Sequence, residues 1–184
     1  VLQALSILDR AIESLPSYPA EQATLETARI LSLASIGRGD RARRLLEPRL
    51  AGARGALRDQ PENAATRVAL TRLLVVQAFV DRHLDRSSLA PLTEAANSLT
   101  HDFVVRHAES LECVRQYLLT QHTLLVFVRS RSPQAALQRV KEVLKTIATL
   151  KKTNRQPAIT TVIESEQQKL QMLLTGINHD LGIR

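Results

Sequence analysis

The segment from Asp59 to Leu84 constrains the fold of this chain more than any other. Pro61 cannot continue a helix that precedes it, and Asn63 is a good N-cap for a helix that follows. Behind that cap, apolar residues recur at three- and four-residue steps and reach nearly every side of the predicted helix: Val68, Ala69, Leu70, Leu73, Leu74, Val75, Val76, Phe79, Val80 and Leu84. A helix that is apolar on almost every side needs neighbours around it, so we expect it to lie between other helices.

The composition favours helices along the whole chain. Apolar residues make up 44% of the 184 residues, aromatic residues only 3%, and there is no Trp. Leu and Ala dominate, which suits closely packed helices better than sheets, because sheets favour β-branched and aromatic side chains. We therefore expect one all-α domain over residues 1–184. Because the chain opens on Val1 rather than Met, we expect this domain to be part of a longer or processed protein.

Apolar periodicity and turn residues divide the chain into eight predicted helices and no strand. The predicted helices cover approximately 1–15, 20–36, 41–57, 64–84, 89–99, 101–128, 133–152 and 158–181. In the second, Ala28, Leu31 and Ala34 are expected to face inward. In the seventh, the inward set is Ala136, Val140, Val143, Ile147 and Leu150. The last has nearly heptad spacing with one charge, Glu166, in its seam, where it could bind a partner or lie at the rim.

Several boundary residues carry their own predictions. Pro16 and Pro19 are expected to end the first helix, and Pro48 to kink or split the third. Gly39 is expected to take a positive φ, with Asp40 and Ser88 as caps. A bend is expected near 120–123, and Pro133 is expected in the first turn of a helix after Ser132.

The turns also show a period. Asp40, Ser87 and Ser132 are 47 and 45 residues apart, which is typical of stacked helical hairpins. The segment from Ala20 to Leu84 resembles the tetratricopeptide-repeat superfamily, in the degenerate form common in bacterial multidomain proteins. Gly39-Asp40 and Pro61-Glu62-Asn63 carry this resemblance, although the Trp and Tyr positions of the family are not matched. It implies antiparallel helical hairpins stacked as an α-solenoid, and an irregular helical bundle stays open as the alternative.

The sequence offers no catalytic or metal-binding motif. The five His residues share no ligand spacing, and no Gly-rich phosphate loop or nucleophile elbow is present. Cys113 is the one cysteine and is expected to be buried. Arg38-Gly39-Asp40 is a tripeptide that some adhesion receptors bind, but here it coincides with a turn that needs those residue types. We expect no enzyme activity, no cofactor and no metal.

Positive charge is concentrated in two segments. Residues 129–155 hold eight Lys and Arg against one Glu, a net +7, and residues 38–59 hold seven Arg against three acids, a net +4. Such segments solvate outer faces in many helical proteins, and they also attract anionic partners. We see no secretory signal and no apolar run near the roughly 20 residues of a membrane span, and we expect a cytoplasmic protein.

These observations predict a non-catalytic scaffold or sensor domain that binds a protein or peptide in the groove of a helical repeat. Arg67, Arg72 and Gln77 are the candidate groove residues, because polar groups on an apolar helix need a reason. The alternative is a regulatory domain that binds nucleic acid or another polyanion through basic residues. Its candidates are Lys141, Lys145, Lys151, Lys152 and Arg155. The last helix is also expected to be able to pair with its twin in a homodimer.

Overall fold

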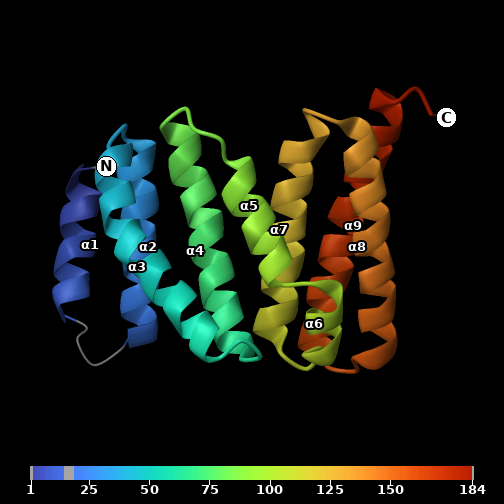
Figure 1. Ribbon diagram of the computed structural model, residues 1–184, viewed down its shortest axis with the longest axis horizontal. Coiled ribbons are helices and arrows are strands. Elements are labelled where there is room, and N and C mark those ends of the chain that lie inside the picture. The colour runs from blue at the N-terminus through green and yellow to red at the C-terminus, as the bar shows by residue number, and fades with distance from the viewer. Residues whose placement is uncertain (1, 15–18, 184) are drawn as a thin grey trace.

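The computed structural model defines the backbone of residues 2–14 and 19–183 and the side chains of residues 6–14 and 23–183 (Figure 1). Every regular element within these ranges is a helix, which confirms the all-α prediction. The described residues form nine helices: α1 (Leu2–Ser14), α2 (Pro19–Ser35), α3 (Gly39–Asp59), α4 (Ala64–His83), α5 (Leu89–Ser98), α6 (His101–Arg106), α7 (Leu111–Arg129), α8 (Pro133–Thr153) and α9 (Pro157–Asp180).

The helices stand side by side in a row from α1 to α8 and α9, and they form two layers (Figure 1). In the first layer α2, α4, α7 and α9 pack against each other in series. In the second layer α3 packs on α2 and α4, and α5 packs on α4 and α7. Within the described backbone α3 and α5 do not contact each other, so each covers the joint between two first-layer helices and leaves a gap beside its neighbour.

Helix α4 is the centre of this arrangement and contacts α2, α3, α5 and α7, as its apolar sequence predicts. Its pattern of burial differs in detail from the prediction. Ala69 and Phe79 are exposed, whereas the polar Thr71 and Asp81 are buried. Ala69 and Phe79 lie on the side of α4 that no other helix covers, because the second layer covers only one face of the first.

Two main apolar cores stabilise the two halves of the row. One is formed by α2, α3 and α4 and includes Ile30, Leu33, Leu46, Leu50 and Leu74. The other is formed mainly by α6 to α9 and includes Phe103, Leu118, Leu125, Ile147 and Leu170. Helix α4 contributes Leu70 to the first and Val68 to the second, so it joins the halves. Of the residues predicted inward on α2, Ala34 is buried, while Ala28 and Leu31 are only partly buried.

The predicted inward faces of the last two long helices are largely confirmed. All five predicted residues of α8, from Ala136 to Leu150, are buried, and Ile159, Ile163, Leu170 and Ile177 of α9 are buried as well. These α9 residues pack into the core with α7 and α8. The apolar seam of α9 that suggested a homodimer thus packs against other helices of the same chain. Pairing of two chains through α9 stays a prediction.

Capping side chains set several helix starts as predicted. The Asn63 side chain accepts a hydrogen bond from Thr66 N at 3.1 Å, and Ser132 accepts one from Ala135 N at 3.3 Å, with Pro133 as the first residue of α8. Ser88 occupies the N-cap position of α5 but makes no side-chain capping bond. The position of Ser88 is confirmed, and the predicted bond is absent.

The turn before α3 corrects two predictions. Gly37, not Gly39, has the positive φ, at 79°. Helix α3 begins at Gly39, so Asp40 lies in its first turn and does not cap it. Gly39 is buried, and a Cβ there would lie 2.6 Å from Leu84 Cδ2. Its lack of a side chain allows the start of α3 to approach the end of α4.

The other helix boundaries agree with the prediction only in part. The helix expected over 101–128 is interrupted at 107–110, and the Ser110 side chain starts α7 by accepting a hydrogen bond from Cys113 N at 3.2 Å. Helix α7 then continues without interruption through 120–123, where a bend was expected. Helix α3 continues past Pro48 without splitting. Helix α2 begins at Pro19, within one residue of the expected start, and α1 is described to Ser14, ahead of both prolines, while Pro16 lies outside the described residues. None of the described helices has the length and apolarity required to cross a membrane.

Candidate functional site

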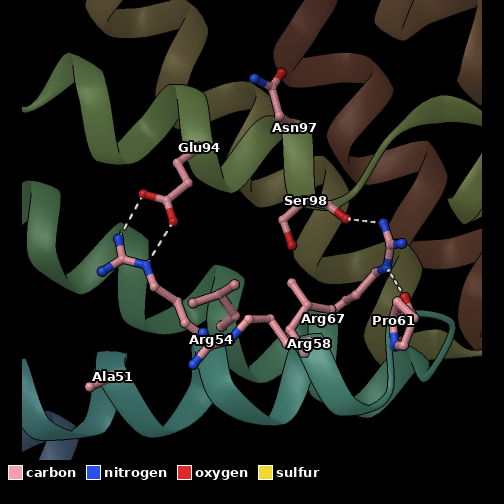
Figure 2. Close-up of a pocket in the computed structure, with 10 residues that line it drawn as sticks. Ala51, Arg54, Arg58, Pro61, Arg67, Glu94, Asn97 and Ser98 are labelled. Atoms are coloured by element: carbon pink, nitrogen blue, oxygen red, sulfur yellow. Dashed lines mark hydrogen bonds and ion pairs between the residues drawn. The ribbon is translucent and has the colours of Figure 1, made fainter.

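The gap between α3 and α5 forms an open groove of about 820 Å³ (Figure 2). Side chains of α3 form one wall, α5 forms the other, and Leu70 of α4 lies in between. The lining combines four apolar residues with six polar ones: Ala51, Leu57, Pro61 and Leu70, and Arg54, Arg58, Arg67, Glu94, Asn97 and Ser98. A mixed, concave surface of this size lies within the range of 300–1,000 Å³ that is usual for ligand sites.

An ion pair spans the groove near one end. Arg54 Nε and Nη2 of α3 donate to the two carboxylate oxygens of Glu94 of α5, at 2.9 and 2.8 Å (Figure 2). The hydrogen bond to Glu94 raises the pKa of the Arg54 guanidinium. Both side chains are 45% exposed, and solvent-exposed pairs contribute only about 0–1 kcal/mol to stability. The pair therefore bridges two helices that share no close backbone contact, but it holds them weakly.

Arg67 closes the other end of the groove, so the structure brings this predicted residue to the site. Arg67 Nε donates to the carbonyl oxygen of Pro61 at 2.6 Å, and Nη1 donates to that of Ser98 at 3.0 Å (Figure 2). Its guanidinium also lies 4.2 Å from the ring centroid of Phe103. The side chain is only 19% exposed. Arg67 thus fastens the end of α5 to the turn before α4, and its main donors are already occupied.

Arg58 has a different status from Arg54 and Arg67. It lies in the last turn of α3, is exposed, and makes no ion pair or hydrogen bond with any described side chain. On α5, the Ser98 hydroxyl points toward the groove, and its oxygen is buried without a hydrogen-bond partner (Figure 2). Arg58 is the cation of the groove that is free to meet a ligand.

Arg72 and Gln77, the other predicted residues of α4, lie elsewhere. Arg72 pairs with Glu112 and donates to Gln116 of α7 at 3.4 Å, on the side of α4 away from α3. Gln77 faces a small cavity of about 180 Å³ against α3, and its Oε1 atom has no hydrogen-bond partner. One turn on, burial raises the pKa of Asp81, and Arg43 and Gln77 offset part of that effect. The three predicted residues therefore point in three directions and form no single site.

The predicted lysines all lie on α8. Lys141, Lys145, Lys151 and Lys152 are exposed on α8, and none has an acidic partner within 4.0 Å among the described residues. The arginines of α3 behave differently, since Arg43, Arg49 and Arg54 pair with Glu47, Glu26 and Glu94. Burial lowers the pKa of Arg49. The basic segment of α3 is thus partly neutralised within the fold. In the other basic segment Arg129 pairs with Asp180, whereas the four lysines of α8 have no such partner among the described residues.

The residues considered for metal or catalytic roles have structural surroundings. Among the described residues no three His, Cys, Asp or Glu side chains gather as metal ligands would. Cys113 is buried, and burial raises its pKa to about 11. Glu166 lies against α7, with Oε2 3.5 Å from His122 Nδ1, and it pairs with Lys169. The seam charge of α9 thus has partners within the chain.

Comparisons of the chain with protein-family models, curated proteins and solved structures give no match. The resemblance to tetratricopeptide repeats therefore stays a prediction. Sequence reasoning noted the Arg-rich third helix but did not find the groove, because Arg54 and Glu94 are 40 residues apart. No local pattern shows that these two side chains face each other.

Proposed function

We propose that this domain is a non-catalytic interaction module, a scaffold or sensor that binds a short segment of a partner protein in the α3–α5 groove. The observation that carries this proposal is the open groove whose lining combines four apolar with six polar residues. Its wall on α3 runs from Ala51 to Arg58, eight residues, or roughly 10 Å of helix. An extended peptide of about three residues has that length.

The chemistry of the lining favours binding over catalysis. The lining residues include no His and no Cys, and the single carboxylate is held by Arg54. Nucleophilic or acid–base catalysis needs a nucleophile and a base within hydrogen-bond reach. The groove supplies apolar surface and fixed hydrogen-bonding groups, which are what recognition of a peptide requires.

The test is a selection of bead-bound random hexapeptides with the labelled protein. Ala51→Trp places a large ring in the groove from α3, and Ala56→Trp places the same ring on an exposed position on the other side of that helix. We expect Ala51→Trp to abolish the selection of the peptides that the natural chain enriches, while Ala56→Trp retains it. Equal selection by both variants would refute binding in the groove.

A second candidate function rests on the unpaired lysines of α8. Lys141, Lys145 and Lys152 recur at four and seven residues and therefore share one face of the helix. A row of free cations favours a polyanion such as nucleic acid, and binding then weakens steeply with salt.

This candidate is tested by the salt dependence of binding to a 20-base-pair DNA duplex. Changing the three lysines to Gln is expected to reduce the slope of log K against log salt by about 2.7, or 0.9 for each phosphate contact. The control removes the same charge from α3 and the turn before it, by changing Arg38, Arg41 and Arg44 to Gln. An equal loss in both variants would indicate a general charge effect and exclude the α8 site.

A further inference from the structure

We propose that the groove recognises an acidic peptide segment whose carboxylate replaces Glu94 on Arg54, so that Glu94 acts as a built-in competitor. This inference rests on the proposed function of the groove and specifies the chemistry of its ligand.

The Arg54–Glu94 pair has the geometry of a ligand contact and the strength of a replaceable one. The two parallel hydrogen bonds, at 2.9 and 2.8 Å, are the bidentate arrangement in which Arg binds carboxylates. Both side chains are 45% exposed, so water and other carboxylates can reach them. Because Glu94 is exposed and lies outside the apolar cores, its side chain can turn away from Arg54 while the buried residues of α5 stay packed.

The charge balance of the groove favours a negative ligand. Three arginines line it, and Glu94 is the one acid among the lining residues, which leaves a net charge of +2. Arg67 is bound to the carbonyl oxygens of Pro61 and Ser98 and pairs with Glu62, outside the lining, at 3.6 Å, so its charge is largely satisfied within the fold. Arg58 lies one helical turn from Arg54 on the same face of α3 and has no partner. A ligand carboxylate on Arg54 therefore finds a second cation beside it.

The apolar part of the lining defines the rest of the ligand. Leu57, Pro61 and Leu70 supply the larger apolar side chains of the lining, and Ala51 adds only a small side chain on the α3 wall. Aliphatic side chains next to the acidic residue can cover this surface. The preferred segment is thus a carboxylate flanked by aliphatic residues, presented in extended form.

The experiment measures the hexapeptides enriched in the selection above, by fluorescence anisotropy of the best one. For the natural chain we expect enriched peptides to contain Asp or Glu next to aliphatic residues. Glu94→Gln removes the competing charge but keeps the size of the side chain, and should tighten binding about two- to fivefold, since an exposed ion pair is weak. Arg58→Gln should weaken binding about tenfold, because it removes a charged hydrogen-bond donor.

The matched control is Arg44→Gln, which removes an unpaired arginine of α3 outside the groove and should change the affinity less than about twofold. Thermal unfolding of each variant verifies that it is folded. If groove-dependent peptides show no acidic preference, or if Glu94→Gln weakens their binding, the competitor role is refuted while groove binding stands. If no enriched peptide depends on Ala51, groove binding and the competitor role fail together.

Discussion

Replacing Gly39 with Ala tests how α3 meets the end of α4. The new Cβ would lie 2.6 Å from Leu84 Cδ2 and 2.8 Å from Leu84 Cγ, closer than van der Waals contact allows. Leu84 is partly buried against the core of α2, α3 and α4, so the shift that makes room for the new Cβ loosens its packing there. Overpacking of this kind costs about 1–3 kcal/mol, and we expect Gly39→Ala to lower the free energy of unfolding by that amount.

The same substitution further along α3 should have the opposite sign. A Cβ at Gly52 or Gly55 would have no other atom within 4 Å apart from its own helix and chain neighbours. Glycine inside a helix costs about 0.5–1 kcal/mol relative to alanine, because it loses more backbone freedom on folding. We expect Gly52→Ala and Gly55→Ala each to raise the free energy of unfolding by about that amount.

Urea unfolding followed by helical circular dichroism measures these changes. A difference of 1 kcal/mol should move the thermal midpoint by about 2–4 °C in a protein of this size. In a Leu84→Ala background, Gly39→Ala should cost less than about 0.5 kcal/mol, because the side chain it strikes is gone. The explanation fails if the cost persists in that background, or if Gly52→Ala destabilises the fold.

Three further predictions follow from the geometry. Arg67→Ala removes two charge-assisted hydrogen bonds and the stacking on Phe103, so the free energy of unfolding measured in urea should fall by about 2 kcal/mol. Arg115 is exposed, and as a control Arg115→Ala should change that free energy by less than about 0.5 kcal/mol. Burial raises the pKa of Asp81, so the folded chain holds this proton to a higher pH than the unfolded chain does. The resulting contribution to the free energy of unfolding is complete below the ordinary carboxyl pKa and is lost as the pH rises through the raised pKa. The stability of Asp81→Asn relative to the natural chain should therefore increase from pH 4 to pH 7, and a constant or falling difference would contradict the burial effect. Burial raises the pKa of Cys113 from 9.0 to about 11, which lowers the fraction of reactive thiolate at pH 8 roughly a hundredfold. We therefore expect iodoacetamide to alkylate Cys113 about a hundredfold more slowly in the folded chain than in 8 M urea. Rapid alkylation of the folded chain would contradict its burial.

Local signals in the sequence were sufficient for much of the helical structure. Asn63 and Ser132 start helices because a side-chain oxygen within the same segment satisfies a free backbone N–H group. The inward face of α8 was predicted residue by residue, because its apolar residues follow the helical period without interruption. By contrast, the break at 107–110 was missed, since the apolar residues on either side of it continue the helical spacing.

The tertiary structure decided which residues meet, and with them the candidate site. The sequence could not distinguish the role of Gly37, which has the positive φ, from that of Gly39, which makes room for Leu84. Nor could it show that Arg67 would be held by Ser98 while Arg58, nine residues earlier, would be left without a partner. Helix formation depends on hydrogen bonds within about four residues, which the sequence displays directly. The groove depends on α3 and α5 packing on the same helix with their backbones apart, and this arrangement of distant segments arises only when the helices stack.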